Sequence, residues 1–480
     1  MKIIHVSSES NPFIKVGGLG DVVYSLCRKL VNKRDDVRII LPMYKNMKGL
    51  DFKSLKKVGN ASVYLAWRNQ GFDIFEGVVN GIIFYFIQND YYFTHRQNTY
   101  GYFDDGERFA FFTLAAKTLI ETLNLNPDIV HIHDWQVGML PVIVREQNPI
   151  NKNFVNAKFI MTIHNPAFQG RYGRPILGDL YNLSDDLFYS GKVRFSGDVS
   201  TLKSGIEYAD MITTVSPTHA FELTTPEGSW GFDGILSGKG NAFKGILNGI
   251  DYDEWNPRKD KLIHRKYGGP DVVVGKRKNK DLLFKEFGLK NNQKPFFVVV
   301  SRLTYQKGVD LIIDAMEQLL TRGYPCFVLG SGEWDYENKL NELHRQYPNL
   351  MGVYIGYSDQ LAHRLYASSD FFLMPSLFEP CGIGQLIAER YGSLPIVRKT
   401  GGLVDSVINY NGNNLDQANG YTFYDNNTDS FMGAINWALE QFKKNHDSVH
   451  LKLMNNALRT VNSWSKSAKE YQDLYKKLLK

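Results

Sequence analysis

The sequence predicts an α/β protein built from two doubly wound parallel-sheet domains. With 480 residues, the chain is too long for one ordinary hydrophobic core. In each half, short apolar runs lead through a loop into an amphipathic helix, as in a βα array. The run at 296–300 is apolar enough for a parallel strand that is covered on both faces.

Composition and charge exclude several classes of function. The chain is 43% hydrophobic and 22% charged, as expected for a soluble globular protein. Its net charge is only +6 and it has no long Lys/Arg run, so nothing indicates nucleic-acid binding. The three cysteines are too scattered for a disulfide framework or a metal site. No signal peptide or apolar run of membrane length is present, so we expect a cytoplasmic protein with no nucleic-acid or membrane partner.

The first strand, expected at 2–7, leads into a glycine loop at 15–21 and then into a helix. A dehydrogenase fingerprint is discounted, because Val23 stands where that motif needs its last glycine. Lys15 beside the glycines suits a phosphate or a sugar. An exposed lysine on a tight turn is the simpler alternative.

The next strand is expected at 37–42, antiparallel hairpins at 60–95 and a helix at 110–123. Two acids, Asp104 and Asp105, stand beside aromatic residues just before this helix. That combination resembles a platform for a sugar, although one aspartate could simply cap the helix.

Histidines mark the ends of two further strands. His131 and His133 share one face of a strand, and Asp134 can cap the helix that follows. Two alternate histidines could bind a metal, but no third ligand is near in sequence, so a strand-end histidine beside a ligand is favoured. His164 and Asn165 repeat the arrangement on the next strand. A shared ligand cleft is therefore expected.

A hinge is expected near Asn248, and the basic stretch at 258–285 is interpreted as a solvated helical connector. After the strand at 296–300, Arg302 and Lys307 lie in the loop before a helix. Two cations at a helix start suit a diphosphate. Solvated surface is the alternative for this pair.

The most informative stretch follows a short strand at 370–375 and precedes a helix at 386–391. It contains Glu379, together with Gly382 and Gly384, at a turn whose N–H groups favour an anion. A carboxylate would repel a phosphate, so Glu379 is expected to hold sugar hydroxyls. The stretch predicts an enzyme acting on a nucleotide sugar.

Further strand-to-loop units are expected at 326–332, 353–357 and 394–403, and a long amphipathic helix at 463–479. Together they predict a second parallel sheet with Tyr357, Glu379 and Thr400 along its carboxyl edge.

Seven stretches together closely resemble the bacterial glycogen synthases and plant starch synthases. The resemblance covers essentially the whole chain and rests on 15–21 (KVGGLGD), 131–135 (HIHDW), 162–165 (TIHN), 245–251 (GILNGID), 301–308 (SRLTYQKG), 378–382 (FEPCG) and 400–403 (TGGL). It implies the GT-B architecture, with two facing Rossmann-like domains, an interdomain cleft and a last helix that returns to the first domain. The implied domains are 1–245 on the acceptor side, 246–458 for the nucleotide sugar, and 459–480 for the returning helix.

The resemblance also implies an activity, the transfer of glucose from ADP-glucose to the non-reducing end of an α-1,4-glucan with retention of configuration. The acceptor would be glycogen, starch or a maltooligosaccharide, and no metal or organic cofactor is implied. The residues implied in catalysis are Glu379, His133, Lys307, Arg302 and Asp104. Those implied in binding the nucleotide sugar are Lys15, Gly18, Asn248, Arg302, Lys307, Tyr357, Cys381, Gly382, Ile383, Gly384 and Thr400.

The resemblance assigns these residues different tasks. Arg302 and Lys307 would bind the ADP phosphates, and Glu379 the hydroxyls of the donor glucose. Tyr357 would stack on adenine, and Asp104 would lie near the acceptor hydroxyl.

One departure from the family pattern bears on the donor site, since Gly384 stands where Thr or Ser is usual. If a hydroxyl at that position bound phosphate, donor affinity should be weaker here. Two alternatives of other classes remain at this stage, a GT-B glycosyltransferase with a UDP-sugar donor and a glucan-binding scaffold without catalysis.

Overall fold

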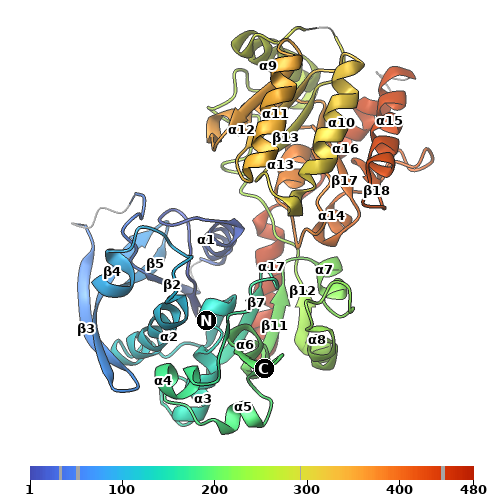
Figure 1. The fold of residues 1–480 in the computed structure, drawn as a ribbon. Helices are drawn as coiled ribbons and strands as arrows, with labels where there is room; N and C mark the ends of the chain where they lie inside the picture. The colour runs from blue at the N-terminus through green and yellow to red at the C-terminus, as the bar shows by residue number, and fades with distance from the viewer. Residues whose placement is uncertain (32–34, 50–53, 292, 445–448) are drawn as a thin grey trace. The chain divides into compact units, whose positions relative to one another are not determined.

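The structure is a computed structural model that describes residues 1–480 except 32–34, 50–53, 292 and 445–448. It divides into two compact units. Unit 1 comprises Met1–Val215, Ala220–Ile246 and Trp464–Lys480, and unit 2 comprises Ser216–His219 and Leu247–Ser463. Each unit is an α/β sandwich around a sheet (Figure 1), which confirms the predicted fold class.

Unit 1 is built on a nine-stranded sheet in the order β12-β11-β7-β6-β1-β2-β5-β4-β3. Its strands are β1 (Lys2–Val6), β2 (Asp36–Pro42), β3 (Lys56–Leu65), β4 (Arg68–Val79), β5 (Ile82–Gln88), β6 (Ile129–His133), β7 (Lys158–Ile163), β11 (Met211–Thr214) and β12 (Phe243–Gly245). A small antiparallel sheet adds β8 (Arg171–Tyr172), β9 (Arg194–Phe195) and β10 (Asp198–Ser200).

The central strands of unit 1 are parallel and almost fully buried, as expected for strands with helices on both faces. The predicted hairpins are confirmed, because β3, β4 and β5 pair antiparallel to one another. Strand β5 then joins the parallel part of the sheet through β2.

The helices of unit 1 are α1 (Gly18–Leu30), α2 (Asp105–Thr122), α3 (Leu140–Gln147), α4 (Ile176–Tyr181), α5 (Asp186–Tyr189), α6 (Thr201–Tyr208), α8 (Asp233–Lys239) and α17 (Trp464–Leu478). Short turns are η1 (Asp90–Thr94), η2 (Trp135–Val137) and η3 (Gly240–Ala242). Helix α7 (Pro217–Glu222) spans the division between the units in sequence.

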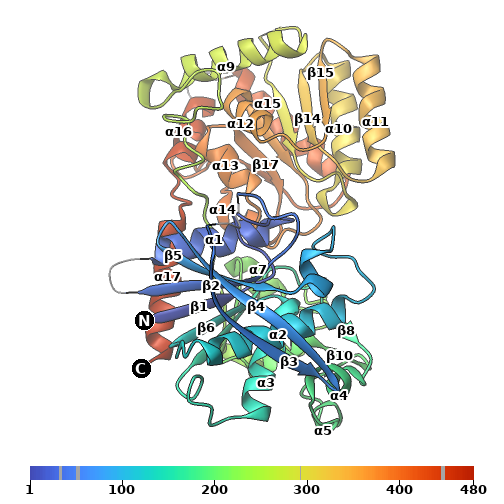
Figure 2. The same cartoon turned by 90° about the vertical axis from the view of Figure 1, so that its left-hand side faces the viewer.

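Two helix starts differ from the prediction. Helix α1 begins at Gly18, inside the expected glycine loop. Helix α2 begins at Asp105 rather than near residue 110, and acids in its first turn suit the positive end of the helix dipole. The last helix, α17, packs against α1 within unit 1, as Figures 1 and 2 show.

Unit 2 contains a six-stranded parallel sheet in the order β15-β14-β13-β16-β17-β18. The strands are β13 (Phe297–Val300), β14 (Cys326–Gly330), β15 (Met351–Ile355), β16 (Phe371–Met374), β17 (Leu394–Arg398) and β18 (Tyr421–Phe423). The helices are α9 (Val272–Phe287), α10 (Val309–Thr321), α11 (Trp334–Gln346), α12 (Asp359–Ser368), α13 (Gly384–Arg390), α14 (Gly401–Ser406), α15 (Thr428–Lys444) and α16 (Leu451–Arg459), with turns η4 (Gly269–Asp271) and η5 (Tyr305–Lys307).

The interpretation of 258–285 as a solvated connector is wrong. Helix α9 packs on α12, and its Lys276 is buried although the stretch is basic. The ammonium of Lys276 donates to the backbone carbonyls of Tyr366, Ala367 and Tyr391, which satisfies its donors inside the protein. Charge content alone therefore misjudged this helix.

Both sheets reverse their winding direction at a defined position. In unit 1 the chain leaves β1 towards β2 on one side and returns to β6 on the other; in unit 2 the same happens between β13 and β16. In open α/β sheets, ligands bind at the carboxyl ends of the strands beside such a switch point. A site is therefore expected at the carboxyl ends of β1 and β6 in unit 1, and of β13 and β16 in unit 2, which we call the β1/β6 edge and the β13/β16 edge.

No helix in the described part of the chain is both long and apolar enough to cross a membrane.

Candidate active site

At the β13/β16 edge, an ion pair joins the two loops that follow these strands. Lys307, after β13, donates from Nζ to Oε2 of Glu379, after β16, at 2.5 Å. Ser376 donates to the same oxygen at 3.0 Å. Among the described residues no donor reaches Oε1 of Glu379. This largely buried carboxylate thus keeps one oxygen available to accept a hydrogen bond from a ligand.

Backbone contacts hold these two loops together. Leu377 donates its N–H to the carbonyl of Gln306 at 2.9 Å, and the Gln306 side chain donates to the carbonyl of Phe378. Gly308 has a φ of +66°, and a Cβ there would lie 2.3 Å from the carbonyl oxygen of Pro375. Only glycine permits this close approach, so the loop geometry that places Lys307 beside Glu379 depends on Gly308.

The loop after β17 closes on the same stretch. Gly402 donates its N–H to the carbonyl of Glu379 at 3.1 Å, and a Cβ at Gly401 would overlap that carbonyl oxygen at 2.0 Å. Thr400, buried just before them, begins helix α14 without a side-chain cap. Glu379 and Thr400, both predicted from sequence, are thus brought together.

Cys381 and Asn248 also meet in unit 2. Burial raises the pKa of the Cys381 thiol to about 12, although hydrogen bonds from Asn248 favour the thiolate. The thiol is therefore protonated at neutral pH and has no nucleophilic character. Asn248 is buried and its Oδ1 makes no hydrogen bond to the described residues.

The structure answers part of the question about Gly384. A Cβ at this position would lie 2.9 Å from the ring of Phe372 and 3.3 Å from the hydroxyl of Tyr366. A side chain at position 384 would therefore point towards the packed interior behind the loop. Gly382, with a φ of +74°, needs glycine for its backbone conformation, and Ile383 precedes the first residue of α13.

Two other predicted residues of unit 2 are exposed. Arg302 follows β13, and its guanidinium contacts no charged partner among the described residues. Tyr357 follows β15, and 78% of its surface is exposed.

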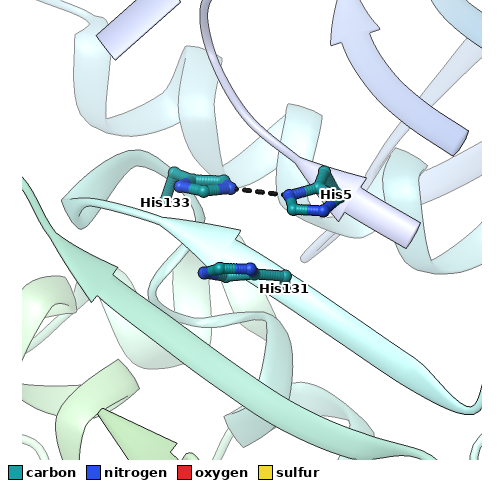
Figure 3. Close-up of side chains that lie close together, drawn as sticks. All are labelled: His5, His131 and His133. Atoms are coloured by element: carbon teal, nitrogen blue, oxygen red, sulfur yellow. Dashed lines mark hydrogen bonds between the residues drawn. The ribbon is translucent and has the colours of Figure 1, made fainter. Parts of the chain in front are cut away.

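At the β1/β6 edge of unit 1, histidines replace the ion pair (Figure 3). His5 Nδ1 lies 3.0 Å from His133 Nε2, and His133 Nδ1 lies 3.0 Å from His164 Nε2. We call these three residues the histidine relay. His5 and His133 are fully buried, whereas His164, after β7, is half-buried. Burial lowers the pKa of His5 and of His164 to about 3 and that of His133 well below its usual value, so the relay is neutral.

The relay has a preferred direction. Each neutral histidine carries one N–H, so the protons of all three rings must point the same way along the chain. His5 Nε2 is buried without a partner among the described residues. Because an unpaired buried N–H is rarer than an unpaired acceptor, the favoured arrangement has His5 donating to His133 and His133 to His164. His164 then carries its proton on Nδ1, at the half-buried end.

The side chain of His133 is fully buried and both of its ring nitrogens are hydrogen-bonded to other histidines. Its place beside a ligand stays a prediction. Strand alternation placed His131 and His133 on one face correctly, but that face is the interior. His131 bonds instead to the hydroxyls of Tyr475 and Thr162.

Three ring nitrogens of His5, His131 and His133 lie within 4.8 Å of one another, which raises the question of a metal. The rings of His131 and His133 stack at 4.4 Å, and those of His5 and His133 are within 15° of parallel. His5 Nδ1 and His133 Nε2 meet at 3.0 Å and share one proton, so they do not both present a lone pair to one ion. The geometry fits hydrogen bonding better than metal coordination.

Asp134 does not cap a helix as predicted. Its carboxylate accepts the N–H of His164 at 2.7 Å, and its backbone has a φ of +58°, a strained conformation for a residue other than glycine. Burial raises the pKa of this carboxyl to about 7. Asp134 therefore anchors the backbone that carries the end of the relay.

The loop after β1 is organised by Glu9, which was not singled out from sequence. Its buried carboxylate accepts the N–H groups of Val16 and Gly17 and the hydroxyl of Tyr100. Lys15, in this loop, pairs with Asp21 at 2.6 Å. The N–H groups of Val16 and Gly17 are thus occupied by a carboxylate of the protein, while Lys15 and Gly18 are exposed just before and at the start of α1.

Through Tyr100, Glu9 also ties this loop to the segment that contains Asp104. Asp104 is paired with Arg96 at 2.7 Å and does not cap α2 through its side chain.

Three residues that lie next to predicted ones were not identified from the sequence, namely Glu9, His5 and Ser376. A single acid, histidine or serine in a strand or loop has no characteristic spacing that could have identified it.

Comparisons with known proteins point to the same family in both halves of the chain. A family model for the starch synthase catalytic domain matches residues 2–238, and one for glycosyl transferases group 1 matches 280–449. A glycogen synthase of Clostridium kluyveri is 42% identical over 480 residues, covering 100% of both chains. A glycogen synthase of Anoxybacillus flavithermus is 40% identical over 482 residues, covering 100% of this chain and 98% of the relative.

Solved structures give the same result. The catalytic domain of starch synthase IV from Arabidopsis thaliana, bound to ADP and acarbose, matches with a TM-score of 0.91 at 33% identity, covering 99% of each chain. A sucrose-phosphate synthase from Thermosynechococcus elongatus matches with a TM-score of 0.63 at 16% identity, and this likeness concerns the fold alone.

Proposed function

The chain belongs to the family of glycogen and starch synthases and is a glucosyltransferase, and from this premise we propose that it transfers glucose from ADP-glucose to the non-reducing end of an α-1,4-glucan. The reaction proceeds with retention of the anomeric configuration, and it needs neither a metal nor an organic cofactor. Glycogen, starch or a maltooligosaccharide serves as acceptor.

One observation carries the donor assignment, namely the open Oε1 of Glu379 beside Lys307 at the β13/β16 switch point. A carboxylate oxygen accepts hydrogen bonds from sugar hydroxyls, and a neighbouring cation offsets the cost of its burial. We assign Glu379 to the hydroxyls of the donor glucose.

Lys307 and Arg302 serve the leaving group. Negative charge grows on the diphosphate as the glycosidic bond breaks, and fixed cations stabilise that charge in the transition state. Lys307 is held by Glu379 in this structure, so the diphosphate shares or displaces that contact when the donor binds. Arg302 is exposed and can turn towards an anion without losing an existing ion pair among the described residues. Lys15 and Gly18 are assigned to the same diphosphate.

The nucleotide is assigned to Tyr357 and to the loop at 381–384 with Thr400. Tyr357 offers an exposed ring that can stack on a base. Stacking by itself does not choose adenine, so the preference for ADP is supported by the starch synthase IV relative, whose structure contains ADP. Asn248 stabilises Cys381 in the wall of this loop.

The residues of unit 1 are assigned to the transferred glucose and the acceptor. Asp104, which pairs with Arg96, is assigned to the acceptor hydroxyl. His133 is assigned an indirect role in catalysis. It donates a hydrogen bond to His164, which then carries its own ring N–H at the half-buried end of the relay.

The test measures glucose transfer to glycogen from ADP-glucose and, in parallel, from UDP-glucose, with EDTA in a third series. Glu379→Gln is the site variant, and Glu342→Gln, an exposed acid on α11, is its matched control. We expect transfer from ADP-glucose alone, unaffected by EDTA, lost in Glu379→Gln and retained in Glu342→Gln. Transfer mainly from UDP-glucose would overturn the adenine assignment, and loss with EDTA would overturn the absence of a metal.

A further inference from the structure

Unit 2 contains a second pocket, formed by residues that take no part in the group around Glu379. It lies against the edge strand β18, between helix α15 and the segment at 409–411, and has a volume of about 470 Å³. Strand β17 separates β18 from β16, so the pocket and the Lys307–Glu379 pair belong to different parts of the sheet. Its volume falls in the range of small-ligand sites.

The chemistry of the lining is neutral and polar, with aromatic rings. The described lining residues carry no charge; they are asparagine, tyrosine, threonine, serine, alanine, phenylalanine and tryptophan. A phosphate or a carboxylate would find no cation there, and an ammonium would find no anion. A neutral ligand with many hydroxyl groups fits this set.

Two aromatic rings form a fixed platform in the pocket. Trp437, on α15, lies nearly parallel to Tyr410, at 14° with ring centroids 6.1 Å apart. The indole N–H of Trp437 donates to the carbonyl of Tyr410 at 3.0 Å, which fixes the ring in place. Trp437 nevertheless remains 37% exposed, so part of a rigid flat apolar surface is open to a ligand. Sugar rings have apolar faces that pack on such surfaces.

Two buried hydroxyls in the lining lack partners. Tyr421 is only 1% exposed, and neither its hydroxyl nor the Oγ1 of Thr422 makes a hydrogen bond with the described residues. Both oxygens are closed to solvent, however, so neither is available to a ligand in the pocket; the exposed Asn411 offers an amide there instead. Asn409, which holds the N–H of Thr422 through its Oδ1, adds an amide to the same wall.

From the neutral polar lining and the fixed, partly exposed Trp437 platform, we propose that this pocket binds glucose units of an α-glucan chain. It would hold the polymer while a chain end reacts elsewhere on the protein. This inference rests on the proposed function for the identity of the acceptor. A long glucan offers many rings, and a second contact raises its apparent affinity through effective concentration. Short acceptors cannot gain in this way.

The test uses the full chain with two variants that act differently. Trp437→Ala removes the platform, and Ser430→Glu places a charge in the neutral pocket at the first turn of α15, where an acid is compatible with the helix. Asn426→Glu, exposed and outside the lining, is the matched control. Binding is read as retardation in native gels that contain glycogen, and kinetics are measured with glycogen and with maltotriose.

We expect both pocket variants to lose retardation and to raise the KM for glycogen about tenfold, with unchanged KM for maltotriose and for ADP-glucose. The control should behave as the unmodified protein does. Unchanged retardation in both variants would overturn the pocket assignment even if glucose transfer is normal. Absence of glucose transfer in the unmodified protein would overturn the proposed function, while the gel would still test the pocket. Equal KM increases for glycogen and maltotriose would also overturn the proposal, because they would indicate damage to the reaction site.

Discussion

The β1/β6 edge of unit 1 and the β13/β16 edge of unit 2 occupy the same topological position in two parallel sheets, yet they carry different chemistry. Unit 2 places a Lys–Glu ion pair there, fixed by glycine contacts between loops. Unit 1 places neutral histidines there, joined ring to ring and ending at a half-buried His164.

The two edges differ in how they keep buried polar side chains stable, with an ion pair in unit 2 and with neutral hydrogen-bonded rings in unit 1. An ion pair with an open carboxylate oxygen and an exposed arginine nearby can exchange partners with a charged ligand. The neutral relay cannot balance the charge of an ionic ligand. It can orient the N–H of His164, and burying neutral rings costs less free energy than burying charged ones. We therefore expect changes in unit 2 to affect donor turnover by charge, and changes in unit 1 to act through proton position or pH.

The largest effect is expected from Lys307→Met. The variant loses the cation that faces the leaving group and leaves Glu379 without its ion-pair partner. We expect kcat/KM for ADP-glucose to fall by about 10²–10³ or more. Steady-state kinetics measure this, with Lys339→Met, an exposed lysine on α11, as the control. A loss below about fivefold would show that Lys307 does not face the developing charge.

The next effect concerns stability and pH at Asp134. Its folded pKa of about 7 lies above the ordinary aspartate value of 3.8, so between these values the folded protein holds a proton that the unfolded chain has lost. Stability from this group is present below pH 4 and is lost as pH rises through 7. Asp134→Asn should therefore gain stability relative to the unmodified protein as the pH rises from 4 to 8, by up to about 4 kcal/mol at pH 8.

Thermal unfolding at pH 5 and pH 8 checks the Asp134 prediction, with the exposed Asp186→Asn on α5 as the control. A difference in Tm between variant and unmodified protein that is the same at both pH values would contradict the raised pKa.

A smaller effect is expected from His133→Leu, which interrupts the histidine relay. Without the donor from His133, the proton of His164 is no longer directed to Nδ1, and we expect kcat to fall about tenfold to a hundredfold with little change in the KM for ADP-glucose. His131→Asn removes a buried histidine from the same cluster but outside the relay, so it controls for structural damage.

Ring ¹⁵N chemical shifts give a direct measurement of the tautomer of His164. We expect the Nδ1–H form in the unmodified protein and in His131→Asn, and a mixture in His133→Leu. An Nε2–H form in the unmodified protein would reverse the direction assigned to the relay.

The smallest effect is expected from Gly384→Ser, the residue type usual in the family at this position. Its side chain would meet Phe372 and Tyr366 behind the loop, so we expect a loss of stability of about 1 kcal/mol and less than a twofold change in the KM for ADP-glucose. A KM that drops several-fold would show that the hydroxyl reaches the donor after all.

The fold class and the family could both be predicted from the sequence, and the comparisons confirm them. Apolar runs followed by amphipathic helices are local patterns, and buried parallel strands such as β6 and β13 can be recognised without knowing their neighbours. Motif order along the chain identified the family in the same way. The individual roles of the predicted site residues stay predictions.

Which groups come into contact could be seen only in the folded structure. Lys307 and Glu379 are 72 positions apart in sequence, and His5 and His133 are 128 apart. Only the strand order of each sheet brings such pairs within hydrogen-bond distance. Burial is likewise a property of packing, which is why the charge pattern misjudged Lys276 and strand alternation could not tell that His133 faces the interior.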